Sequence, residues 1–187
     1  DKLRFHLRQE YGIPQDAIVV LSVDRLVRRK GFDQVIRFLP TLLAEGINLY
    51  YLVCGKGAME AELRSLATEL GVEARVMFAG YVPDAALAGY YATCDLFSMI
   101  TTYDQNARSI EGFGIVYLEA GYFGKPVLAA KSGGVEDAVQ PGETGLLVNP
   151  DDAAESCHAL RQLCLAPDLR DRLGQRGKAL AIRHTPH

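Results

Sequence analysis

Two glutamates with seven residues between them, Glu111 and Glu119, enclose the stretch of this sequence that is richest in potential chemistry. Gly112 and Gly114 lie just after the first glutamate, at the expected mouth of a helix. The first amides of a helix have no intrahelical partner, so they can bind an anion with the helix dipole behind it. Glu119 lies about two turns further on, where a carboxylate suits bidentate acceptance from the vicinal hydroxyls of a ribose.

Glu119 also has a structural interpretation, as a surface glutamate on an amphipathic helix. Its neighbours in the segment 116–122 are almost all apolar or aromatic, however. A carboxylate in a mostly buried helix needs polar partners, because burial without them is costly. The pattern therefore favours a binding role for Glu119.

A second candidate is the basic loop that runs from Asp24 to Gly31. It carries four cations in six positions, at Arg25, Arg28, Arg29 and Lys30, directly before an expected helix. Arginine grips phosphate with a bidentate fork and lysine adds a point charge, so the loop predicts a local anion site. A solvated basic turn explains the same pattern equally well.

Two further loops carry weaker signals. Gly55 and Gly57 flank Lys56 after an expected strand, and such glycines let a backbone approach a ligand and leave amides free to donate. They match neither the dinucleotide fingerprint nor the P-loop, and a tight turn accounts for them as well. The segment 80–83 places an aromatic, Tyr81, and Val82 before a proline, which favours either a slot for a planar base or a plain turn into a helix.

The elements that must position these loops follow an alternating pattern. Apolar runs that read as strands alternate with segments of helical period, which is typical of a parallel sheet covered on both faces. We predict one doubly wound, Rossmann-like α/β domain over residues 1–187, with ligands beyond the carboxyl ends of its strands. The expected strands are 17–23, 48–54, 75–79, 95–100, 125–130 and 145–148, and the expected helices 31–45 (kinked or divided at Pro40), 59–70, 84–94, 114–123, 151–165 and 168–181.

Composition excludes several classes of protein. The net charge of −3 gives no global reason to expect nucleic acid as a partner. The four cysteines form no CxxC pair and the four histidines no cluster, so we expect reduced thiols, a cytoplasmic location and no bound metal. No apolar run is long enough for a transmembrane span. The sequence opens at Asp1 in an apparent helix, and we expect it to be a fragment of a longer protein.

Taken in order, these segments resemble glycosyltransferase family 4, whose enzymes have the two-domain GT-B fold. The resemblance covers about residues 19–165 and rests most on the two glutamates of the fourth segment, with seven residues between them. The matching segments are VDRLVRRKGFD (23–33), CGKG (54–57), RVMFAGYVP (75–83), EGFGIVYLEAGYFGKPVLA (111–129) and GGVEDAVQPGETGLLV (133–148).

The resemblance implies a C-terminal donor-binding half of a retaining, metal-independent enzyme that transfers a hexosyl unit from a nucleotide sugar. It implies that Arg25 and Lys30 hold the diphosphate and stabilise the leaving nucleotide, and that Glu111 contacts the donor sugar or flanks its reacting carbon. Glu119 would bind the ribose. The remaining donor contacts would come from Gly55, Gly57, Tyr81, Val82, Gly112, Phe113, Gly114 and Ile115.

The resemblance also implies partners outside this chain. The acceptor site would lie in an N-terminal domain, which would also allow peripheral membrane association. The chain alone should bind donor without transferring it. One departure stands out, because Asp24 replaces the usual glycine before Arg25 and should weaken phosphate binding unless Arg28 or Arg29 holds it. Two other readings stay open: a nucleotide-sugar epimerase of the same architecture, and a nucleotide-binding domain without catalytic activity.

Overall fold

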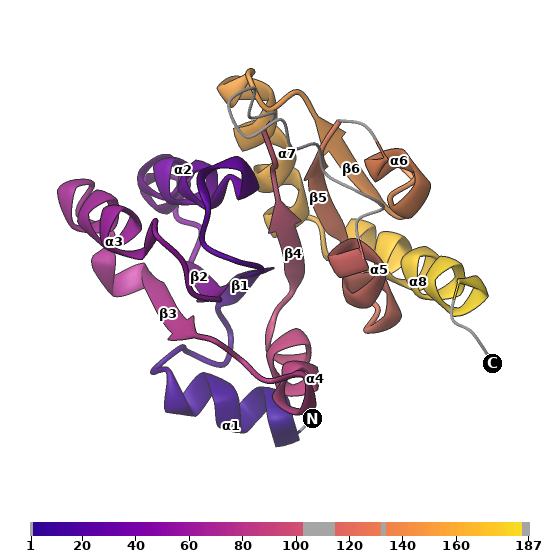
Figure 1. Cartoon of the computed structure of the whole chain (residues 1–187), viewed down its shortest axis with the longest axis horizontal. Helices are drawn as coiled ribbons and strands as arrows, with labels where there is room; N and C mark the ends of the chain where they lie inside the picture. Colours follow the sequence, from indigo (N-terminus) through magenta and orange to yellow (C-terminus); the bar gives the residue numbers. More distant parts are fainter. Residues whose placement is uncertain (1, 103–114, 132–133, 185–187) are drawn as a thin grey trace.

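A six-stranded parallel sheet forms the centre of the protein (Figure 1). The computed structural model describes residues 2–102, 115–131 and 134–184. The strand order is β3-β2-β1-β4-β5-β6, and this confirms the predicted α/β fold of Rossmann type. The strands are β1 (Ile18–Val23), β2 (Leu49–Cys54), β3 (Val76–Gly80), β4 (Leu96–Met99), β5 (Val127–Ala130) and β6 (Gly145–Val148).

Helices cover both faces of this sheet. Figure 1 shows α2, α3 and α7 on one side and α1, α4, α5 and α8 on the other. The helices are α1 (Lys2–Glu10), α2 (Phe32–Ala44), α3 (Glu60–Glu69), α4 (Asp84–Thr93), α5 (Ile115–Tyr122), α6 (Val135–Ala138), α7 (Ala153–Leu165) and α8 (Pro167–Arg183). Short 3-10 helices occupy Arg28–Lys30 and Glu73–Arg75. Because both faces are covered, β1, β2, β4 and β5 are buried almost throughout, as their apolar sequences predict.

Helix α2 excludes one of the two outcomes expected at Pro40, a division of the helix. It continues from Phe32 to Ala44 with Pro40 inside it, so Pro40 does not divide the helix. Buried side chains lie on both sides of the proline, among them Ile36, Leu39 and Leu42. Packing of this apolar face against the sheet outweighs the loss of one backbone hydrogen bond at the proline.

A buried ion pair fixes α1 to the sheet. The Arg8 side chain is 0% exposed and its guanidinium donates to the carbonyls of Ala17 and Thr93 as well as to Asp95 Oδ2, at 2.7, 2.9 and 3.0 Å. Arg4 reaches the other carboxylate oxygen at 2.9 Å, and the Val19 N–H donates to Asp95 at 2.8 Å. Asp95 therefore joins α1, the end of α4 and the start of β1 in one network.

Glycines let α8 pack closely on α5. A Cβ added to Gly121 would lie 2.8 Å from the Gly177 carbonyl oxygen, and one added to Gly174 would collide with the carbonyl of Gly124. The two helix backbones are thus nearly in contact at this crossing. This crossing sets the position of α5, which carries Glu119.

We predict that Asp95→Asn lowers the free energy of unfolding by about 3–5 kcal/mol, because it leaves Arg8 buried without its counter-charge. Burial alone raises the pKa of Asp95, but the Val19 N–H and the two guanidiniums outweigh it and hold that pKa below its usual value. The stability that this carboxylate contributes is therefore present above its unfolded-state pKa and is lost as pH falls through the folded-state pKa.

Urea unfolding at several pH values measures this effect. The matched control is Asp33→Asn, which breaks the exposed pair with Arg37 and should cost less than about 0.5 kcal/mol. Equal losses for the two variants would contradict the role given to Asp95.

Candidate functional site

A pocket of about 550 Å³ opens at the carboxyl ends of β1, β2 and β3. The loops after these three strands line it, together with two residues of α4 and two of α5. The described residues that line it are Val23, Asp24, Arg25, Cys54, Gly55, Lys56, Tyr81, Val82, Asp84, Leu87, Val116 and Glu119.

The position of this pocket follows from the topology. After β1 the chain moves outward to β2 and β3, and it then returns to add β4 on the other side of β1. Connections leave β1 and β4 in opposite directions, which opens a crevice beyond their carboxyl ends. Three loops on one side of this crevice and α5 on the other thus bring residues 25, 56, 81 and 119 to one pocket.

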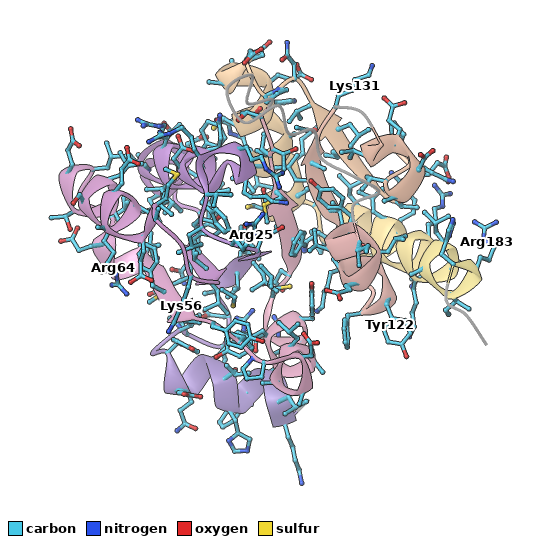
Figure 2. The ribbon with its side chains drawn as sticks, in the orientation of Figure 1. Arg25, Lys56, Arg64, Tyr122, Lys131 and Arg183 are labelled. Atoms are coloured by element: carbon cyan, nitrogen blue, oxygen red, sulfur yellow. The ribbon has the colours of Figure 1, made fainter. Side chains whose placement is uncertain are left out.

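The basic loop does not act as one cluster. Arg25 is exposed and lines the pocket, and it is labelled near the middle of the molecule in Figure 2. Arg28 instead pairs with Glu62 of α3 at 2.8 Å and lines a separate, smaller cavity between α2 and α3. The 3-10 turn Arg28–Lys30 directs these cations to different sides.

Lys30 lies behind the pocket wall and contacts Asp24. Its side chain is 6% exposed, and its Nζ lies 2.9 Å from Asp24 Oδ2. Asp24 itself lines the pocket, and its other oxygen accepts the backbone N–H of Arg25 at 2.7 Å. The sequence left open whether Arg28 or Arg29 holds Asp24; in the structure Lys30 pairs with Asp24, and Arg28 pairs with Glu62.

The glycine pair after β2 mainly brings two loops together. The backbone N–H of Gly55 donates to the Gly80 carbonyl at 2.7 Å. This amide was expected to be free for a ligand, but the Gly80 carbonyl already accepts its hydrogen bond. Its φ of 142° and its closeness to the Asp24 carbonyl exclude a side chain there. Gly55 lines the pocket, whereas a Cβ on Gly57 would collide with the backbone of Leu26. Ligand binding by Gly57 stays a prediction.

The structure places Tyr81 and Val82 in the pocket wall, with Tyr81 68% exposed and Val82 buried. It also adds two charged residues that the sequence patterns did not single out, Lys56 and Asp84. Lys56 follows Gly55 and Asp84 follows the turn 80–83. The one sequence signal that could have indicated them is that they come shortly after the ends of two expected strands. Their charges make this part of the pocket polar as well as apolar.

Glu119 lies on α5 with its carboxylate in the pocket wall. The hydroxyl of Tyr91 donates to Glu119 Oε2 at 3.3 Å. Partial burial raises the pKa of Glu119, and the nearby carboxylates of Asp84 and Asp24 raise it further, while the Tyr91 hydrogen bond lowers it. A carboxylate with one described partner in such a pocket can accept hydrogen bonds from hydroxyls of a ligand.

The glycine-rich mouth of the helix lies mostly outside the described residues. Glu111, Gly112, Phe113 and Gly114 belong to the segment 103–114, so their proposed roles stay predictions. Ile115 begins α5 and is 68% exposed.

Within the part of the chain that the structure describes, no group of three or more His, Cys, Asp or Glu side chains could hold a metal ion. Among the same residues, no helix has the length and apolarity needed to cross a membrane.

The positive charges that line the pocket come from Arg25 and Lys56.

Comparison with known proteins identifies the family. Residues 4–180 match the model for glycosyl transferases group 1. The chain is 35% identical over 179 residues to a GDP-mannose-dependent α-(1-6)-phosphatidylinositol monomannoside mannosyltransferase of Mycolicibacterium smegmatis, covering 96% of the chain and 47% of that protein. It is 36% identical over 170 residues to the lipopolysaccharide core biosynthesis glycosyltransferase LpsE of Rhizobium meliloti, covering 91% and 46%.

Solved structures agree with this family assignment. Anabaena HepE in complex with UDP and glucose superposes with a TM-score of 0.84 at 28% identity, over 97% of this chain and 48% of that one. The C-terminal domain of a group 1 glycosyl transferase (LpcC) from Francisella tularensis shares the fold, with a TM-score of 0.80 at 22% identity, over 96% and 91%. The chain therefore belongs to the group 1 glycosyl transferases and has the Rossmann-like fold of one GT-B half. It spans about half the length of the curated relatives that it matches.

We predict that Asp24→Asn strengthens the binding of UDP or GDP severalfold. The change removes a negative charge from the pocket and releases Lys30 from its ion pair, while an asparagine oxygen can still accept the Arg25 N–H. Isothermal titration calorimetry at constant ionic strength measures the affinity. Uridine or guanosine binding should not change, and weaker diphosphate binding by the variant would contradict this account of Asp24.

Proposed function

We propose that this chain supplies the donor-binding half of a retaining, metal-independent glycosyltransferase that moves a hexosyl unit from a nucleotide sugar to a glycan, lipid or other acceptor. The observation that carries the proposal is a single pocket at the crevice between the strand connections, lined by both Glu119 and Arg25. One side chain suits ribose hydroxyls and the other suits a diphosphate.

The shape and chemistry of the pocket support one orientation for the donor. The base would lie against Tyr81, Val82 and Leu87, the ribose at Glu119, and the diphosphate at Arg25. Lys30 would reach the diphosphate by exchanging its ion pair with Asp24. As the glycosidic bond breaks, negative charge grows on the departing nucleotide, and positive side chains held in place stabilise it.

The relatives support a hexosyl donor. One is named as GDP-mannose-dependent, and a structural neighbour was solved in complex with UDP-glucose. Because the chain spans about half of such proteins, we propose that the acceptor site and the rest of the catalytic machinery lie in a second, N-terminal domain. Closure of both halves around the substrates would then be needed for transfer.

We predict that the chain binds UDP or GDP, and that Arg25→Ala weakens this binding about tenfold by removing a charged hydrogen bond to phosphate. Binding of the corresponding nucleoside should be unaffected. Lys178→Ala, on the exposed face of α8, is the matched control and should change neither affinity. Calorimetry with well-folded protein measures all of these, and an absence of binding by UDP, GDP and ADP alike would count against the proposed function.

Metal independence has its own test. We predict that EDTA leaves the affinity for UDP or GDP unchanged, because Arg25 and Lys30 supply the positive charge. Added Mg²⁺ or Mn²⁺ should likewise have no effect after correction for free metal–nucleotide complexes. A loss of binding in EDTA that returns on adding metal would contradict this part of the proposal.

A further inference from the structure

The buried tyrosine beside the pocket, Tyr91, is held rigidly. Its side chain is 0% exposed. Its ring stacks on Phe123 with centroids 4.9 Å apart and planes 8° apart, and on Phe97 with centroids 6.0 Å apart. Tyr91 belongs to α4, Phe97 to β4, and Phe123 directly follows α5. Three elements therefore fix the ring, and with it the place of its hydroxyl.

The hydroxyl of Tyr91 contacts the carboxylate that lines the pocket. It donates to Glu119 Oε2 at 3.3 Å, while Tyr91 is not among the described residues that line the pocket. The terminal torsion of a glutamate is broad, so the carboxylate plane is poorly defined unless a partner holds it. Tyr91 is the partner that the described structure provides.

We propose that Tyr91 is a positioning residue for nucleotide recognition: its hydroxyl holds one oxygen of the Glu119 carboxylate and leaves the other for the ribose hydroxyls. The inference rests on the proposed function for its ligand. The hydrogen bond itself is a property of the chain alone. Tyr91 would thus act on the nucleotide through Glu119 and not by contact.

The charges around Glu119 explain why such a partner matters. Asp24 and Asp84 share the pocket with it, and both disfavour its ionised form, as burial does. Arg25 and Lys56 line the same pocket. The Tyr91 hydrogen bond lowers the pKa of Glu119, and burial raises the pKa of the Tyr91 hydroxyl, which therefore stays protonated as the donor.

The neighbouring tyrosine on α4 provides a matched control. The hydroxyl of Tyr90 bonds to that of Tyr11 on the loop after α1, at 2.7 Å, and not to a pocket residue. Tyr90→Phe and Tyr91→Phe each remove one partly or fully buried hydroxyl from the same helix. A merely structural effect should appear in both variants, whereas a positioning effect should appear in Tyr91→Phe alone.

The first test is ribose discrimination. The wild-type chain should bind UDP or GDP more tightly than the 2′-deoxy form of the same nucleotide. Tyr91→Phe should reduce this ratio by about threefold to tenfold, the effect expected when an interaction worth about one ordinary hydrogen bond is lost, because Tyr91 acts on the ribose only through Glu119. Tyr90→Phe should leave the ratio unchanged. In a Glu119→Gln background, Tyr91→Phe should have no further effect on it.

The second test needs no ligand. Carboxyl-detected NMR titration of Glu119 should show a higher pKa in Tyr91→Phe than in wild type, with no change in Tyr90→Phe. An unchanged ratio or an unchanged Glu119 titration would overturn the role given to Tyr91. If the wild type binds neither nucleotide, the proposed function fails, and the titration alone then decides whether Tyr91 holds Glu119.

Discussion

The order of strands around β1 is the constraint on which the rest of this structure depends. With β2 on one side of β1 and β4 on the other, the chain leaves these strands in diverging directions and cannot close the space beyond their carboxyl ends. The loops after β1, β2 and β3 form one wall of that space, and α5 brings Glu119 to it. The Asp95 network and the glycine contacts between α5 and α8 fix the positions of the elements that form these walls, although neither lies in the pocket.

Negative and positive side chains line the pocket together. Asp24, Asp84 and Glu119 place three carboxylates in a cavity that we propose for a diphosphate-bearing ligand, against the cations Arg25 and Lys56. Lys30 is engaged by Asp24 at its edge. Under the proposed function, a diphosphate would have to compete with the Asp24 carboxylate for Lys30, so we expect Asp24 to weaken the binding of phosphate.

Much of the fold was predictable, because strands buried on both faces must be apolar throughout and the turns between elements carry glycine and proline. Strand 145–148 was predicted to the residue, and the other strands within one or two residues at their ends. Helix α6 was missed because its four residues are too few to show a helical period. Pro40 does not divide α2, one of the two outcomes expected for it, because tertiary packing outweighs a local propensity.

The site was predicted less completely, for a physical reason. Arg25, Tyr81, Val82 and Glu119 lie in short motifs that the sequence singles out, and all four line the pocket. The pairing of Lys30 with Asp24, the diversion of Arg28 to Glu62, and the contact of Tyr91 with Glu119 depend on side-chain geometry across elements. The spacing of residues along the chain carries no record of such contacts.

The most direct test of the central claim is to map where a nucleotide binds. Backbone amide NMR spectra of the chain, recorded during titration with UDP and then GDP, should show shifts concentrated at residues 23–25, 54–56, 81–84 and around Glu119. The cavity between α2 and α3, at Arg37 and Leu66, should be silent. Shifts centred on that second cavity, or none in the crevice, would contradict the account.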